Sequence, residues 1–324
     1  METELKFQIP QGQREAVHAA VLALGADCTR LQAVYADTAD QRLAKAGLAL
    51  RLRLEGEHWV QTLKGRGDGM LQRQEDEVPL GMAAVAPAFD PQRHRDSEVG
   101  QQLLLLLADG AALQEVYRTD IDRLHANVRA PTWAAGPDSP ASSQSRIELA
   151  LDRGQILANG QRREVHEIEF ELKSGSVQDL LAVVRPWLQQ HQLWWDVRTK
   201  SEMGYRLAFN QRTKAAVTGP ATTASATLMQ CLQHALPNAA EIADGLGQTA
   251  HAEQLHLALQ QLMAWMARQP QTGDVASVAD IDCQSPQQVR AHSLQLFLLQ
   301  ALQAACVIRE GDAEQVPASV RALV

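Results

Sequence analysis

The strongest constraint in this sequence is a short charged string that occurs twice. Residues 2–6 read Glu-Thr-Glu-Leu-Lys, and residues 169–173 read Glu-Phe-Glu-Leu-Lys. Alternate side chains of an extended strand lie on one face, about 7 Å apart, so each string places two carboxylates and an amine on one side. Ile168, Phe170 and Leu172 form the apolar opposite face of the second string. We therefore expect strands that pack on one side and turn their charges inward.

Closely spaced carboxylates allow two interpretations. They repel one another unless a cation lies between them, which predicts a metal site. Alternatively, both strings are solvated polar faces of ordinary strands. The recurrence of the string, together with the basic strands between its two copies, favours the metal site.

The chain between the two strings contains short alternating strands with basic faces. Residues 48–55 place four leucines on one side and Arg51 and Arg53 on the other. Strands are predicted over 48–55, 59–64, 72–78, 113–128 and 146–152, with a turn at 153–155. Helices are predicted over 13–24, 100–107 and 177–188, a polar turn over 35–43 and a loop over 131–145. Consecutive short strands separated by turns favour an antiparallel sheet or barrel over a βαβ fold.

A closed barrel of these strands would gather charges of both signs in its lumen. Such a lumen is costly to keep dry, so we expect it to hold water, metal and a multiply charged ligand. Basic side chains suit phosphate oxygens, which Arg can bind bidentately. Carboxylates suit Mg²⁺ or Mn²⁺, which are commonly shared with substrate phosphates. A metal-bridged chain of phosphates would satisfy both groups.

Composition narrows the class of protein. The net charge of −8 and the calculated pI of about 5.7 argue against nucleic-acid binding, which favours a basic surface. No apolar run reaches the ~18 residues of a membrane-spanning helix, and the acidic N-terminus lacks the apolar segment of a signal peptide. We therefore expect a cytoplasmic protein without a membrane partner. The four cysteines form no C-x-x-C pair, so no zinc knuckle or disulfide framework is indicated.

The chain changes character near residue 211. Residues 1–210 read as the sheet domain and 211–222 as a linker, and residues 223–324 are rich in Leu, Gln and Ala at helical spacing. A helix is predicted over 286–305. With a soft prior of one domain per ~150 residues, the sequence predicts two domains.

Seven segments, in order, resemble the CYTH, or triphosphate tunnel metalloenzyme, family. They are residues 2–6, 35–42, 47–53, 59–64, 73–77, 147–152 and 167–173. The resemblance covers about residues 1–210. It implies an α+β fold, in which an eight-stranded antiparallel β-tunnel with flanking helices hydrolyses triphosphates with Mg²⁺ or Mn²⁺.

The resemblance also implies a role for each matching residue. The metal-binding acids would be Glu2, Glu4, Glu169 and Glu171, meeting around one metal site. The substrate phosphates would be bound by Lys6, Arg51, Arg53, Lys64, Arg73 and Arg123. The catalytic residues would be Glu148, Asp152 and Lys200, with Glu148 and Asp152 holding or orienting the metal and the attacking water. The sequence offers no recognised covalent nucleophile motif.

The helical part resembles a short, degenerate CHAD domain, which follows the tunnel in some bacterial inorganic triphosphatases. CHAD domains are usually basic, whereas residues 211–324 contain six Lys and Arg against nine Asp and Glu. Packing or homo-oligomerisation is therefore expected of this part, rather than polyphosphate binding.

Together these features predict an inorganic triphosphatase that converts tripolyphosphate to pyrophosphate and phosphate. Thiamine triphosphatase and adenylate cyclase activities are alternatives on the same fold. A non-catalytic triphosphate or polyphosphate-binding module is the alternative from another class. The absence of an evident aromatic platform for a base or thiazole favours the inorganic substrate.

Overall fold

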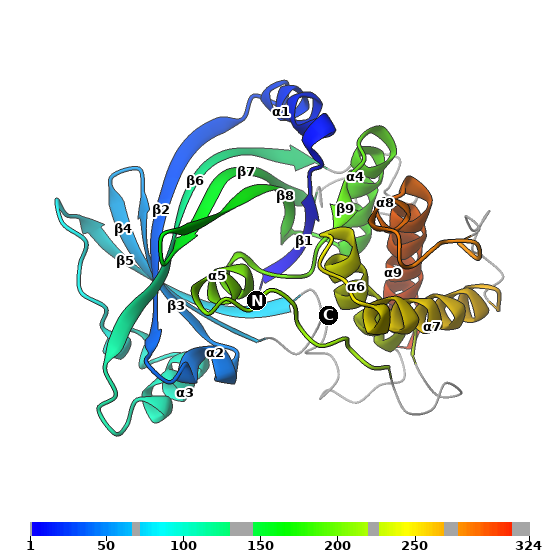
Figure 1. Ribbon diagram of the computed structural model, residues 1–324. Helices are drawn as coiled ribbons and strands as arrows, with labels where there is room; N and C mark the ends of the chain where they lie inside the picture. Colours follow the sequence, from blue (N-terminus) through cyan, green and yellow to red (C-terminus); the bar gives the residue numbers. More distant parts are fainter. Residues whose placement is uncertain (1, 67–71, 130–144, 220–226, 269–277, 313–324) are drawn as a thin grey trace.

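The computed structural model describes residues 2–66, 72–129, 145–219, 227–268 and 278–312. Its largest element is an antiparallel sheet of nine strands in the order β5-β4-β3-β2-β6-β7-β8-β1-β9 (Figure 1). The strands are β1 (Glu2–Gln8), β2 (Asp27–Thr38), β3 (Ala49–Glu55), β4 (His58–Arg66), β5 (Gln72–Met82), β6 (Leu113–Arg129), β7 (Arg146–Ala158), β8 (Gln161–Ser174) and β9 (Trp194–Trp195). The sheet closes because β1 also pairs with β5, through Glu2 with Arg73 and Thr3 with Gln72.

The expected number of eight strands is wrong, since the sheet has nine. The first two residues of β1 pair with β5. Farther along the same edge, Phe7 and Gln8 pair with Trp195 and Trp194 of β9. The ninth strand therefore fills the part of the β1 edge that β5 does not reach.

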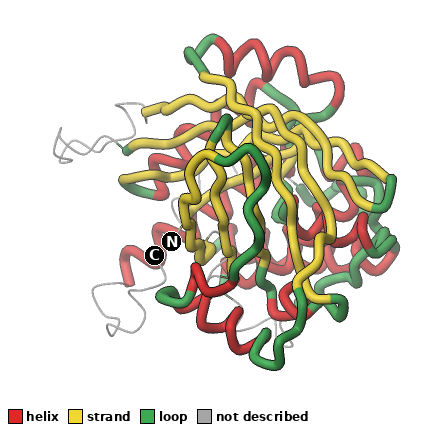
Figure 2. The backbone as a smooth tube through the Cα atoms, turned by 90° about the vertical axis from the view of Figure 1, so that its left-hand side faces the viewer, coloured by secondary structure: helices red, strands yellow, loops and turns green. Residues whose placement is uncertain are grey.

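Side-chain alternation decides which face of each strand turns inward. Leu5 and Phe7 are fully buried in the outer core, whereas Glu4 and Lys6 line the interior cavity. In β3, Leu50 and Leu52 are buried outside the cavity, and the two arginines of this strand point into it. The predicted period-2 pattern is confirmed in both strands, and Figure 2 shows the strands curling around the interior.

Short helices cover the ends and flanks of the sheet. They are α1 (Arg14–Leu22), α2 (Arg42–Ala46), α3 (Glu98–Leu106), α4 (Val177–Gln190) and α5 (Lys200–Ala208), with 3-10 turns at Gln11–Gln13 and Pro91–His94. Ser97, Ser176 and Thr199 cap α3, α4 and α5 by accepting a hydrogen bond from a backbone N–H of the first turn. Helix α5 differs from the others because it lies within the curve of the sheet (Figure 1).

Two local predictions are wrong. Residues 35–38 belong to the long strand β2 rather than to a turn, because their backbone pairs with β6 through a register shift after Tyr35. The turn predicted at 153–155 is also absent, since β7 continues to Ala158 and turns into β8 at residues 159–160. The predicted loop over 131–145 lies outside the described residues except for Ser145.

The C-terminal part is helical and packs against the sheet. It comprises α6 (Leu228–Ala243), α7 (Thr249–Met266), α8 (Pro286–Val289) and α9 (His292–Asp312), so the single helix predicted over 286–305 is divided in two. One buried cluster contains side chains of β1, β8 and α4 together with side chains of α6, α7 and α9. Segment 211–219 is tied to these helices, with Val217 N and O bonded to the Asn238 side chain. The domain boundaries and the CHAD assignment stay predictions. Among the helices that the structure describes, none combines the length and the apolar composition that a membrane span requires.

Candidate active site

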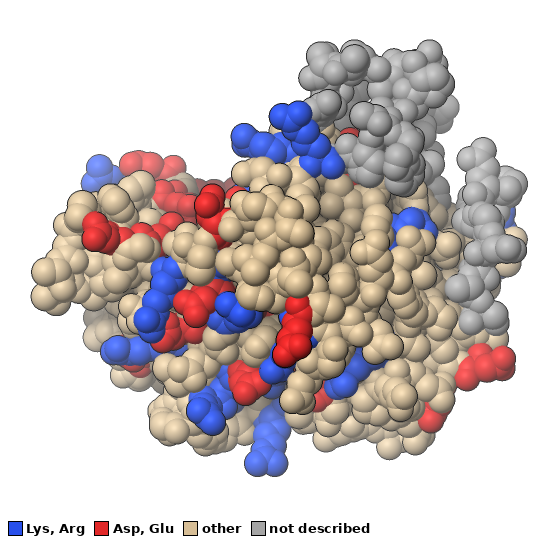
Figure 3. Space-filling model, turned by 90° about the horizontal axis from the view of Figure 1, so that it is seen from above, with Lys and Arg blue, Asp and Glu red and all other residues tan. Residues whose placement is uncertain are grey.

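A cavity of about 760 Å³ occupies the interior of the closed sheet. Its walls come from β1 to β8, and α5 lies along one side. Seen from above, basic and acidic side chains are interleaved on the side of the molecule that holds the sheet (Figure 3). The cavity therefore has the mixed charge that the sequence predicted.

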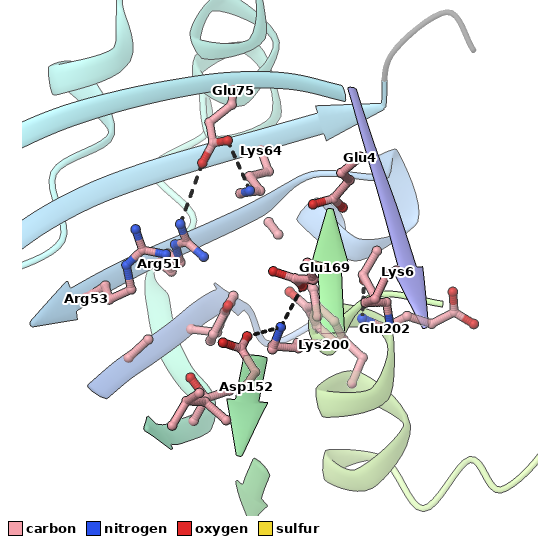
Figure 4. A pocket seen from close by; sticks show the side chains of 18 of the residues that line it. Glu4, Lys6, Arg51, Arg53, Lys64, Glu75, Asp152, Glu169, Lys200 and Glu202 are labelled. Atoms are coloured by element: carbon pink, nitrogen blue, oxygen red, sulfur yellow. Dashed lines mark hydrogen bonds and ion pairs between the residues drawn. The ribbon is translucent and has the colours of Figure 1, made fainter. Parts of the chain in front are cut away.

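One wall of the cavity is basic. Arg51 and Arg53 of β3 and Lys64 of β4 point inward there (Figure 4). Glu75 of β5 lies 3.5 Å from Arg51 and 3.0 Å from Lys64, so this acid holds the two cations side by side. Burial, followed by repulsion from Arg51, lowers the pKa of Arg53. An anionic ligand would relieve this repulsion.

An acidic cluster lies across the cavity from the basic wall. Asp152 of β7 and Glu167 and Glu169 of β8 each place one oxygen within 4.8 Å of the others. Arg123 of β6 binds Asp152 at 2.6 and 2.7 Å and Glu169 at 2.6 Å. Burial would raise the pKa of Asp152 and Glu169, but Arg123 and Lys200 hold both values below the usual range. Asp152 and Glu169 are therefore ionised at neutral pH.

Lys200 lies in the middle of this cluster (Figure 4). It is the first residue of α5, and its Nζ is 2.6 Å from Asp152 and 2.8 Å from Glu169 and also contacts Glu167. Burial would lower its pKa, but the three carboxylates raise it well above the ordinary value. An ammonium group thus neutralises part of the negative charge that the strands bring together.

The two copies of the charged string lie on neighbouring strands. In the ladder between β1 and β8, Glu4 is opposite Glu171 and Lys6 is opposite Glu169. Lys6 donates to Glu167 at 3.1 Å and to the backbone oxygen of Arg198. Lys173 bonds Glu171 at 2.6 Å.

Most of the predicted site residues share this cavity. They are Glu4, Lys6, Arg51, Arg53, Lys64, Arg123, Glu148, Asp152, Glu169, Glu171 and Lys200. Glu148 is opposite Glu171 in the ladder between β7 and β8, and its oxygen lies 3.6 Å from Lys173. Glu4 and Glu171 line the cavity without belonging to the Asp152 cluster. The side chains of Glu2 and Arg73 lie outside the described part of the structure.

The sequence prediction gave no site role to two residues of the cavity region, although it expected one of them, Glu167, on the charged inner face of its strand. Glu167 is 3% exposed and belongs to the acidic cluster. The sequence feature that indicates its role is its position on the same alternating face of the strand as Glu169 and Glu171. Tyr35 lines the cavity and stacks on Tyr117 with ring centroids 4.4 Å apart. Burial would raise its pKa, but the cations Arg51, Arg53 and Lys200 lower it. Tyr35 was missed because its segment was predicted to be a turn.

The acidic cluster fits a hard divalent cation. Mg²⁺ and Mn²⁺ prefer oxygen ligands, and the three carboxylates of the cluster supply only oxygen donors within reach of one ion. Hydrogen bonds from Arg123 and Lys200 already occupy part of the accepting capacity of these carboxylates. The donor chemistry therefore supports metal binding without selecting one metal.

The sequence profile of the CYTH domain matches residues 1–205, more than half of the chain. This chain belongs to the CYTH family. Its closed antiparallel sheet with a charged interior agrees with that assignment. The resemblance found in the sequence is thereby confirmed.

The CYTH protein is also similar to individual relatives. An inorganic triphosphatase of Haemophilus influenzae is 29% identical over 180 residues, which are 55% of this chain and 46% of the relative. The chain thus spans about half the length of this curated relative. Among solved structures, a candidate adenylyl cyclase from Hippeastrum with a dominant triphosphatase activity is 16% identical, with 64% of this chain and 96% of that one covered and a TM-score of 0.43. A candidate adenylate cyclase from Bacillus halodurans is 18% identical, with 59% and 89% covered and a TM-score of 0.36.

Proposed function

We propose that this CYTH protein hydrolyses inorganic triphosphate to pyrophosphate and phosphate with a divalent metal, Mg²⁺ or Mn²⁺. One observation carries the proposal: a single cavity of about 760 Å³ is lined both by the basic wall and by Asp152 and Glu169 of the acidic cluster. A compact polyanion that shares a metal ion with carboxylates needs both surfaces. The relative from Haemophilus influenzae, an inorganic triphosphatase, supports the same substrate class.

The chain's own residues suggest how the reaction is arranged. Arg51, Arg53 and Lys64 would bind the phosphate oxygens and neutralise charge as the terminal P–O bond breaks. Glu148 and Asp152 would orient the water that attacks the terminal phosphorus, and Lys200 would hold Asp152 in place. A bound divalent ion would supply further neutralisation of the transferring phosphoryl group. Water adds its oxygen to phosphorus, and pyrophosphate leaves with the bridging oxygen.

Two tyrosines line the cavity, and exposed aromatic rings there could bind the base of ATP or the thiazole of thiamine triphosphate. Tyr35 is only 6% exposed, and Tyr117 covers one face of its ring. Tyr205 donates its hydroxyl to Asp37 at 2.8 Å and stacks on Phe209. Tyr35 is therefore covered, and Tyr205, although half-buried, is engaged by Asp37 and Phe209, so the two rings offer limited free surface for a base or thiazole. This packing favours the inorganic substrate over thiamine triphosphate or ATP.

The test is phosphate release from tripolyphosphate, thiamine triphosphate and ATP, each with Mg²⁺ or Mn²⁺ and again after EDTA. We expect the highest kcat/KM on tripolyphosphate and loss of turnover in EDTA. Tight tripolyphosphate binding without turnover under either metal would instead favour the binding module. A higher kcat/KM on ATP or thiamine triphosphate would assign the organic substrate.

Several finer expectations belong to this proposal. They are a cytoplasmic location, the absence of a nucleic-acid partner, homo-oligomerisation through the helical part, and a degenerate CHAD origin for residues 223–324.

A further inference from the structure

Helix α5 decides where Lys200 lies, and it is only nine residues long. It begins at Lys200, whose ammonium reaches Asp152 and Glu169. A short helix is marginally stable by itself, so neighbouring elements must fix its position. The contacts that do this come from both sides of the helix.

On the sheet side, α5 packs closely on β6. A Cβ added at Gly204 would lie 2.3 Å from a ring carbon of Tyr117, so only glycine allows this approach. The Tyr117 ring also contacts Tyr205 edge-to-face at 5.5 Å. Close packing against the Tyr117 ring thus fixes this side of the helix.

On the other side, one carboxylate of the helical part contacts residues that come before and after Lys200 in the sequence. Glu241 of α6 is 3% exposed, and its Oε1 lies 2.6 Å from Arg206 and 3.6 Å from Arg198. Arg198 precedes Lys200 by two residues, and Arg206 follows it by six. Glu241 therefore contacts the chain before and after the residue that enters the cavity.

Further acids hold Arg198 in its position. Asp196 binds its guanidinium at 2.8 and 2.9 Å, and Asp244 at the end of α6 lies 3.0 Å from it. The backbone oxygen of Arg198 accepts a hydrogen bond from Lys6. The same short segment thus connects the acids of α6 to a lysine of the cavity.

We propose that Glu241 is a positioning residue for the reaction in the tunnel: through Arg198 before α5 and Arg206 in its last turn it fixes the position of this helix, and thereby places Lys200 between Asp152 and Glu169. The inference rests on the proposed function. It gives the helical part a direct role in the site, although Glu241 itself does not line the cavity. A displacement of about 1 Å in a catalytic group can cost about 100-fold in rate, so a loosened α5 should be visible in turnover.

The experiment is a double-mutant cycle on tripolyphosphate turnover with the variants Glu241→Gln, Lys200→Gln and both together. We expect Glu241→Gln to lower kcat about tenfold or more with KM changed less than about twofold. In the Lys200→Gln background, the same substitution should change kcat less than about twofold, because effects through a shared residue are not additive. If Glu241→Gln acted only by reducing stability, it would lower kcat by the same factor in the wild-type and Lys200→Gln backgrounds.

The matched control is Arg185→Gln. Arg185 of α4 donates to Gln303 of α9 at 2.7 Å, so it also links the sheet-side helices to the helical part but does not touch α5. We expect this variant to keep wild-type kcat. If Glu241→Gln does not fold, Glu241→Asp, which keeps the charge but shortens the reach, enters the same cycle.

The outcomes separate this inference from the proposed function. Equal kcat losses in the two backgrounds, or no loss in Glu241→Gln, would overturn the positioning role. Absence of turnover in the wild-type protein would overturn the proposed function. In that case, the tripolyphosphate affinities of the same variants, measured by calorimetry, would replace kcat in the double-mutant cycle. There too, additive effects would refute the role of Glu241.

Discussion

Glu4 of β1 and Glu171 of β8 are directly opposite each other in the antiparallel ladder, and both line the cavity. Like charges in this arrangement destabilise a sheet unless a cation offsets them. Lys173 supplies one such cation, at 2.6 Å from Glu171. The two copies of the repeated string are therefore adjacent in space, and their acids face the same interior.

Neutralising either member of this pair should remove activity without unfolding the protein. We expect Glu4→Gln and Glu171→Gln each to lower kcat by about 100-fold or more, measured by phosphate release with Mg²⁺ or Mn²⁺. Melting curves should stay close to wild type because repulsion between the acids is reduced. Glu164→Gln is the control, since Glu164 lies on the same strand but is 68% exposed and pairs with Arg14. Wild-type rates in the Glu4 and Glu171 variants would remove these residues from the site.

Arg53 should contribute more to ligand binding than to folding. Its pKa is lowered by burial and by repulsion from Arg51, and its ion pairs with Glu55 and Glu77 offset these effects only in part. We expect Arg53→Gln to weaken tripolyphosphate binding about tenfold, as loss of a charge-assisted hydrogen bond would, while the free protein melts at or above the wild-type temperature. Calorimetry and thermal melting test the two effects. Arg30→Gln, on an exposed pair with Asp120, should leave affinity unchanged, and a similar loss there would indicate a non-specific charge effect.

The buried Asp196 should make the protein sensitive to acid. Burial would raise its pKa, but Lys6 and Arg198 hold it below the ordinary value of 3.8. A lowered folded-state pKa stabilises the protein above the unfolded-state value, and this stabilisation is lost as the pH falls from about 3.8 toward the folded-state pKa. Denaturant unfolding should be measured between pH 6 and pH 3 for the wild-type protein and for Asp196→Asn. Below pH 3.8, the unfolding free energy of the wild type should fall more steeply with decreasing pH than that of the variant, by up to about 1.4 kcal/mol per pH unit. Identical slopes would contradict this linkage.

Removing the helical part should destabilise the sheet domain. Phe7, Phe170 and Trp195 belong to the same buried cluster as Leu232, Leu255 and Phe297, so deletion of residues 215–324 would expose apolar surface of the sheet and α4. Exposed apolar area costs about 25 cal/mol per Å², and we expect aggregation or a melting temperature lowered by at least about 10 °C. Size-exclusion chromatography and circular dichroism measure the outcome. A monomeric, wild-type-stable fragment would show that the sheet domain folds independently.

The sequence alone determined the charge pattern of the sheet. The period-2 alternation around Glu4 and Glu169 dictates that acids share a face and apolar residues share the other, because a strand has no alternative way to place neighbouring side chains. The same argument placed Arg51 and Arg53 on one face of their strand and Lys64 on the polar face of the next. These assignments needed only local geometry, which is why they agree with the structure.

The tertiary structure decided which charges meet. That Lys200 enters a cluster formed by Asp152, Glu167 and Glu169 depends on where α5 packs, and no local pattern encodes that position. The ninth strand likewise depends on how much of the β1 edge β5 leaves open. Glu241 reaches the flanks of Lys200 only because α6 folds back on the sheet domain. Pairing across long sequence separations is set by packing of the whole chain, whereas the repeated Glu-x-Glu-Leu-Lys string fixes only the side of the strand on which its charges lie.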